Sequence, residues 1–84
     1  MKFTVHYFAS YRERLSLSTE QLAWAGAEAN LGEVRAFLQA RGGAWAEVMS
    51  SSGMLMSLNQ SLASVTAVVS DGDEVAFFPP VTGG

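Results

Sequence analysis

The sequence predicts an α+β domain in which one main helix packs across one face of a mixed sheet of four or five strands. Hydrophobic residues alternate with a period of two in short segments near both ends of the chain. A pattern with helical periodicity follows Asn30 in the middle. Because a helix separates the early from the late strands, the chain can cross over and place a late strand parallel to the first.

The N-terminal part predicts a β-hairpin. Residues 2–8 alternate in polarity and are rich in β-forming side chains, with Phe3, Val5 and Tyr7 on one face. A short helical turn is expected over residues 9–14. A second strand, expected between residues 15 and 24, would pair with the first. Its inward side chains are either Leu15 and Leu17 or Leu22 and Trp24.

The clearest helix signal begins at Asn30. Asparagine is a favourable N-cap, and Glu33 three residues later can complete a capping box. An apolar stripe follows at Leu31, Val34 and Leu38, widened by Phe37. Gly42 and Gly43 suit a helix end, which predicts a helix of about 11 residues.

The C-terminal half predicts shorter strands. Residues 44–53 are ambiguous: Trp45 and Val48 or Met49 could extend a broken helical pattern, whereas residues 50–53 are expected to form a loop. Residues 54–59 alternate as a third strand. A turn and a short strand or irregular stretch are expected up to residue 69. Residues 70–73 form a strong turn signal around Gly72, and the last strand is expected over residues 74–78, ending before Pro79.

Length and composition exclude several classes of protein. At 84 residues the chain has room for one domain, which we expect over residues 1–78, followed by a functional tail over residues 79–84. The net charge of −3 and the scattered basic residues argue against nucleic-acid binding. Apolar residues are dispersed, so no membrane segment is expected, and without a leader pattern we expect a cytoplasmic protein.

Cysteine is absent from the sequence. A disulfide framework, a thiolate zinc site and a catalytic thiol of the chain's own are therefore excluded. His6, the single histidine, is expected to be structural. Asp71, Asp73 and Glu74 are expected to belong to a turn, since calcium loops need more ligands at set spacings. We expect no metal site and no bound cofactor.

The C-terminal tail is the strongest functional candidate. Pro79 and Pro80 cannot donate backbone hydrogen bonds and hold φ near −65°, so the chain is expected to leave the sheet as a stiff, extended segment. Val81 and Thr82 follow, and then come Gly83 and Gly84. Glycine has no side chain, which allows such a tip to enter a narrow channel.

The sequence DGDEVAFFPPVTGG at residues 71–84 resembles the C-terminus of the molybdopterin synthase small subunits, a family of ubiquitin-like sulfur carriers with the β-grasp fold. Shorter matches lie at Phe8–Ala9, at Arg12–Glu13 and at Leu58–Gln60. Length and the order of elements also agree with that family. The resemblance therefore extends over the whole chain and is most specific in the tail.

The resemblance implies a cycle of sulfur loading and delivery. An adenylyltransferase related to ubiquitin-activating enzymes would use ATP to adenylate the Gly84 carboxylate, and a sulfur donor would convert it to a thiocarboxylate. The tail would then enter the large subunit of a molybdopterin synthase heterotetramer, where the sulfur passes to a pterin precursor. This chain would be the non-catalytic, sulfur-donating subunit of that sulfurtransferase.

Two further residues are candidates for partner binding. Phe77 and Phe78 are adjacent on a strand and face opposite sides of the sheet, and we expect Phe77 in the core. Phe78 is expected either to contact a partner or to pack against a loop. Arg12, like Arg14, is expected either to form an ion pair with a partner protein or to be solvated.

Three other functions are compatible with these features. A sulfur carrier for thiazole synthesis also ends in two glycines, but that family is usually shorter and lacks the Phe-Phe-Pro-Pro spacer. A ubiquitin-like modifier would be conjugated to lysines. A plain interaction module would carry the tail without using it.

Overall fold

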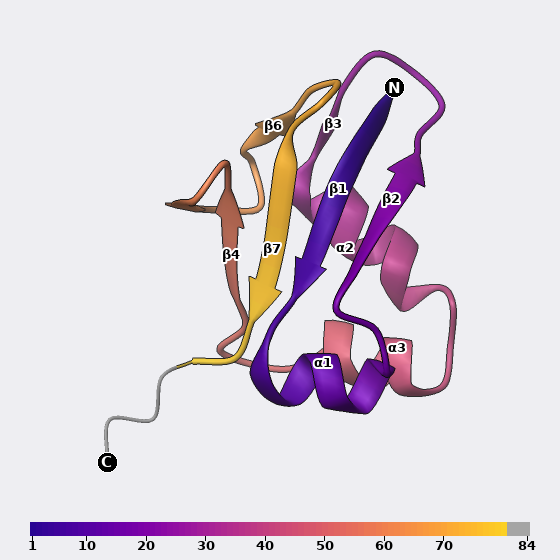
Figure 1. Cartoon of the computed structure of the whole chain (residues 1–84), viewed down its shortest axis with the longest axis vertical. Coiled ribbons are helices and arrows are strands. Elements are labelled where there is room, and N and C mark those ends of the chain that lie inside the picture. Colours follow the sequence, from indigo (N-terminus) through magenta and orange to yellow (C-terminus); the bar gives the residue numbers. More distant parts are fainter. Residues whose placement is uncertain (81–84) are drawn as a thin grey trace.

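Ten helices and strands follow one another along the part of the chain that the structure, a computed structural model, describes, residues 1–80 (Figure 1). In chain order they are β1 (Lys2–Tyr7), α1 (Ala9–Leu15), β2 (Thr19–Ala23), β3 (Ala29–Asn30), α2 (Leu31–Gln39), α3 (Ala44–Met49), β4 (Leu55–Leu58), β5 (Ser61–Ala63), β6 (Val68–Val69) and β7 (Glu74–Phe78). None of the helices described is long and apolar enough to cross a membrane.

Five strands form one mixed sheet in the order β2-β1-β7-β4-β5. The hairpin of β1 and β2 is antiparallel, as the sequence predicts. β7 lies parallel to β1 and antiparallel to β4, which confirms the expected crossover. β3 and β6 form a separate two-stranded sheet. Helix α2 packs behind the five-stranded sheet, and Figure 1 views the sheet from its other face.

Helix α2 begins as the sequence predicts. The Asn30 side chain accepts a hydrogen bond from the Glu33 amide at 2.7 Å, and the Glu33 carboxylate accepts one from the Asn30 amide at 2.9 Å. The stripe side chains Leu31, Val34 and Leu38 are all fully buried. The expected widening of this stripe by Phe37 is wrong, because Phe37 is 47% exposed and instead packs edge-on against Trp24.

Tertiary contacts settle the segments that the pattern left open. The first half of residues 44–53 is helical and forms α3, whose Val48 and Met49 are buried. In β2 the buried side chain is Leu22, while Trp24 just beyond the strand is partly buried and lies 6.0 Å from the Phe3 ring. Both segments are short, so their structure depends on packing more than on local periodicity.

A cluster around Tyr7 ties the sheet to the helices at one end of the molecule. The Tyr7 hydroxyl donates a hydrogen bond to Glu20 at 2.8 Å, and Arg41 binds both Glu20 oxygens at 2.9 Å. The Arg41 guanidinium lies 4.4 Å from the centre of the Trp45 ring. Burial raises the pKa of Tyr7, as does its bond to Glu20. Burial would raise the pKa of Glu20, but hydrogen bonds from Arg41 and Tyr7 outweigh it and lower that pKa.

The two adjacent phenylalanines of β7 lie on opposite faces of the sheet, and only one of them is in the core. Phe77 is fully buried and stacks on Tyr7, with ring centres 6.2 Å apart, and Val75 is also fully buried, as the sequence predicts. Phe78 points to the other face and remains partly exposed. The backbone amide of Phe8 donates to the Phe77 carbonyl at 3.2 Å, which extends the pairing of β1 and β7.

Replacing Glu20 by glutamine is expected to lower the free energy of unfolding by about 1.5–3 kcal/mol at pH 7, because a bidentate charge-assisted bond is lost. The folded-state pKa lies below the ordinary 4.5, so the carboxylate stabilises the fold fully above pH 4.5 and loses this effect as the pH falls through the lowered value. Urea denaturation of the wild-type protein and of Glu20→Gln should show that the difference between their free energies of unfolding becomes smaller as the pH falls below 4.5.

Glu47→Gln is the matched control for this prediction. Its carboxylate forms an ion pair with Arg14 at 2.8 Å, but the Glu47 side chain is 70% exposed. We therefore expect a loss below about 1 kcal/mol. Equal losses for Glu20→Gln and Glu47→Gln would contradict the role assigned to the Tyr7 cluster.

Phe77→Ala is expected to destabilise the protein by about 3–5 kcal/mol, since it removes a fully buried ring and leaves a cavity. Phe78→Ala should cost about 1 kcal/mol, because only part of that ring is withdrawn from water. Chemical denaturation of the two variants measures the contrast. A larger loss for Phe78→Ala would refute the placement of Phe77 as the anchor of β7.

Candidate functional site

The candidate site lies where β7 ends and the chain leaves the sheet. β7 is hydrogen-bonded on both edges, to β1 over Glu74–Phe77 and to β4 over Val75–Phe78. Because β1 and β4 both hold the strand, its C-terminal end has a defined position. Figure 1 shows this point at the end of the molecule occupied by α1 and α3, opposite the N-terminus.

The turn that precedes β7 is fastened by hydrogen bonds. Asp71 accepts from the Lys2 amide at 2.8 Å, and Asp73 accepts from the Ser70 amide at 2.7 Å. The Asn59 side chain bridges the turn, donating to Asp73 and accepting from the Glu74 amide. The acidic residues at this turn therefore have structural partners. Among residues 1–80, no three histidine or acidic side chains are grouped to hold a metal ion.

The described chain ends just beyond the strand. Pro79 is half-buried and Pro80 is exposed, and neither belongs to a helix or strand, so the strand stops where the sequence predicts. The other tail residues singled out by the sequence lie outside the described residues: Val81, Thr82, Gly83 and Gly84.

A sheet face that carries two exposed apolar side chains, Phe8 and Leu62, lies next to this exit point, and we call it the open face. It is the sheet face that α2 does not cover, and a row of paired residues crosses it: His6, Ala76, Ser57 and Leu62. Phe8 stacks on His6 with ring centres 6.1 Å apart and is 46% exposed, while Leu62 is 72% exposed. Phe78 points to the same face, because it lies two residues after Ala76.

The open face contains a hollow of about 210 Å³, which Ala76 lines together with His6, Phe8, Ser57 and Glu74. The His6 ring lies 2.9 Å from the Glu74 carboxylate. Sequence reasoning missed Phe8 and Leu62 as surface candidates. The alternation in β1 places Phe8 opposite the buried set and could have identified it, whereas Leu62 lies in a strand too short to show a period.

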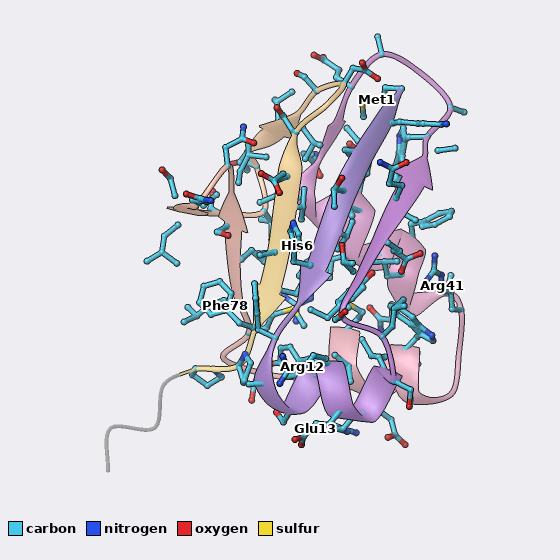
Figure 2. All side chains as sticks on the ribbon, viewed as in Figure 1. Met1, His6, Arg12, Glu13, Arg41 and Phe78 are labelled. Carbon is cyan, nitrogen blue, oxygen red and sulfur yellow. The ribbon has the colours of Figure 1, made fainter. Side chains whose placement is uncertain are left out.

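The two arginines of α1 differ in their surroundings. Arg14 bonds to Glu47 of α3, so it has a partner within the chain. Arg12 is exposed on the same helix. Figure 2 shows Arg12 and Phe78 at the end of the molecule where β7 stops, and Arg41 at the far edge of the sheet. The fold thus brings Arg12 to the same end of the molecule as the exit point.

The chain is similar to known proteins over nearly its whole length. A model of the ThiS family matches residues 5–84. A curated relative, the molybdopterin synthase sulfur carrier subunit of Haemophilus influenzae, is 42% identical over 82 residues, which cover 95% of this chain and 96% of the relative.

Two solved structures share the fold. In a complex of subunits 1 and 2 of the molybdopterin-converting factor from Helicobacter pylori, the matched chain has a TM-score of 0.69 and 26% identity, with both chains fully covered. The small archaeal modifier protein 1 of H. volcanii has a TM-score of 0.73 and 25% identity, covering 95% of this chain and 98% of its own. The expected β-grasp fold is confirmed, and the extent of the family match shows that this chain belongs to the ThiS family.

Proposed function

We propose that this chain is the sulfur carrier subunit of a molybdopterin synthase, and that Gly84 carries the sulfur as a C-terminal thiocarboxylate. The observation that carries this proposal is the 42% identity, over nearly the whole chain, to a relative with that name. The tail sequence at residues 79–84 supports it, since it follows a strand whose position is held from both sides.

The chemistry proposed for Gly84 requires activation. A terminal carboxylate with a pKa of roughly 3.3–3.7 is ionised at neutral pH and is a poor electrophile. In the proposed loading reaction the carboxylate attacks the α-phosphate of ATP, and pyrophosphate leaves. A sulfur nucleophile then attacks the acyl carbon, and AMP leaves. The chain has no cysteine, so its own side chains offer no thiol as an alternative carrier.

We assign separate roles to the domain and the tail. Residues 1–78 act as the β-grasp domain that presents residues 79–84 to two enzymes in turn, an adenylyltransferase for loading and the large synthase subunit for delivery. Pro79 and Pro80 end the strand because they lack amide hydrogens. Phe77, buried against Tyr7, anchors the strand from which the tail starts. Loading from ATP and delivery to the synthase would take place in the cytoplasm.

We assign the open face, with Phe78 and Phe8, to contact with the large subunit. Exposed aromatic side chains are enriched at protein interfaces, and here they adjoin the exit of the tail. The related Helicobacter pylori protein was solved in complex with its subunit 2. Arg12, exposed at the same end of the molecule, is proposed to form an ion pair with one of the two partners.

Deleting Gly83 and Gly84 is expected to abolish sulfur transfer in a reconstituted assay with the activating enzyme, ATP, a sulfide source, the large subunit and the pterin precursor. The melting temperature should stay nearly unchanged, because the buried hydrophobic residues of the described part of the chain lie within residues 3–77. Mass spectrometry of the intact full-length protein should show one oxygen replaced by sulfur, and only when ATP is supplied. Retained sulfur transfer by the truncated protein would refute the proposal.

Phe8→Ser is expected to weaken binding to the large subunit by at least about tenfold, as for a buried aromatic residue of an interface. Phe37→Ser is the matched control, since Phe37 is 47% exposed but lies beside Arg41 at the far edge of the sheet. Calorimetric titration of both variants measures the difference. Equal affinities would exclude the open face as the docking surface.

A role as a protein modifier is the second candidate, favoured by the similarity to the small archaeal modifier protein. It makes a different prediction about the products formed in cells. Modification would attach the C-terminus to lysines of many host proteins, whereas the carrier would co-purify with one larger subunit. A pull-down with a free C-terminus, followed by mass spectrometry, distinguishes the two.

A further inference from the structure

Gly53 and Pro80 face each other just beyond the end of the sheet. The last residues paired between β4 and β7 are Leu55 and Phe78, and two more steps along each antiparallel strand lead to Gly53 and Pro80. Figure 1 shows the connection from α3 to β4 passing beside the point where the chain leaves β7. The fold thereby brings Gly53 close to Pro80, which lies 27 positions further along the chain.

The proline ring occupies the space where a side chain at residue 53 would stand. A Cβ added to Gly53 would lie 3.3 Å from Pro80 Cγ and 3.8 Å from both Cβ and Cδ of that ring. The shortest of these distances is tighter than an ordinary van der Waals contact, so the ring would have to move by a few tenths of an ångström. Gly53 also has a φ of +77°, which glycine adopts at little cost.

The loop that carries Gly53 is held firmly from the core side. The Arg35 guanidinium of α2 donates to the Met49 carbonyl at 2.6 Å and to the Ser51 carbonyl at 2.9 Å. Met49 on one side of the loop and Met54 on the other are buried. The loop therefore provides a fixed surface against which Pro80 rests.

We propose that Gly53 is a positioning residue, and that the loop Ser50–Gly53 sets the direction in which the tail leaves the sheet at Pro80. The inference rests on the proposed sulfur-carrier function and adds a residue outside the tail that controls the direction of the tail. Pro80 has no N–H to donate to the sheet, so the close approach of its ring to Gly53 is the observation from which we infer what holds it. The direction of the tail matters because reacting groups must be aligned closely for group transfer.

Gly53→Ala is expected to slow single-turnover sulfur transfer within the complex by about tenfold, while leaving the affinity for the large subunit unchanged. Gly42→Ala is the matched control. Gly42 has the same φ of +77°, yet an added Cβ there would meet nothing within 4 Å. The two variants should therefore lose similar thermal stability, and only Gly53→Ala should lose transfer rate. Equal rates in the two variants would overturn the inference.

A double-mutant cycle with Pro80→Ala tests whether the effect passes through the ring. If Gly53→Ala acts by displacing the ring, it should slow transfer little further in a Pro80→Ala background. Independent, multiplicative losses would overturn the inference. An inactive wild-type protein in the same assay would instead refute the sulfur-carrier function, so the two failures are distinguishable.

Discussion

The rest of the structure depends on the insertion of β7 between β1 and β4. This last strand is hydrogen-bonded on both edges, and its Phe77 side chain stacks on Tyr7 in the core. Tyr7 in turn bonds to Glu20, whose carboxylate holds Arg41 above the Trp45 ring. Because the strand nearest the C-terminus lies inside the sheet, the segment that follows it starts from a rigid base.

The two ends of β7 are built in different ways. At its start, the carboxylates of Asp71 and Asp73 and the side-chain oxygen of Asn59 accept hydrogen bonds from backbone amides. At its end, Pro79 and Pro80 bring no amide hydrogen, and the Pro80 ring lies close to Gly53. A domain of this kind positions the tail and does not supply reactive side chains. This suits the proposed function, in which the partner enzymes carry out the chemistry.

Local signals made some elements predictable. The capping box of Asn30 and Glu33 forms as expected, because its partners are three residues apart and need no tertiary support. Helix α3 has six residues and depends on contacts such as that of Trp45 with Tyr7, so its local pattern was ambiguous. Phe37 fits the helical stripe by spacing, but Trp24 meets it at the surface, outside the core.

The sequence by itself determined the identity of the tail, the end of β7 at Pro79 and the absence of a thiol, since each is a property of consecutive residues or of composition. Only the tertiary structure decided which residues surround the exit of that tail. The row from His6 through Ala76 to Leu62 and the contact of Gly53 with Pro80 join positions far apart in the chain. Strand register creates such neighbours, and register depends on which faces the whole sheet buries.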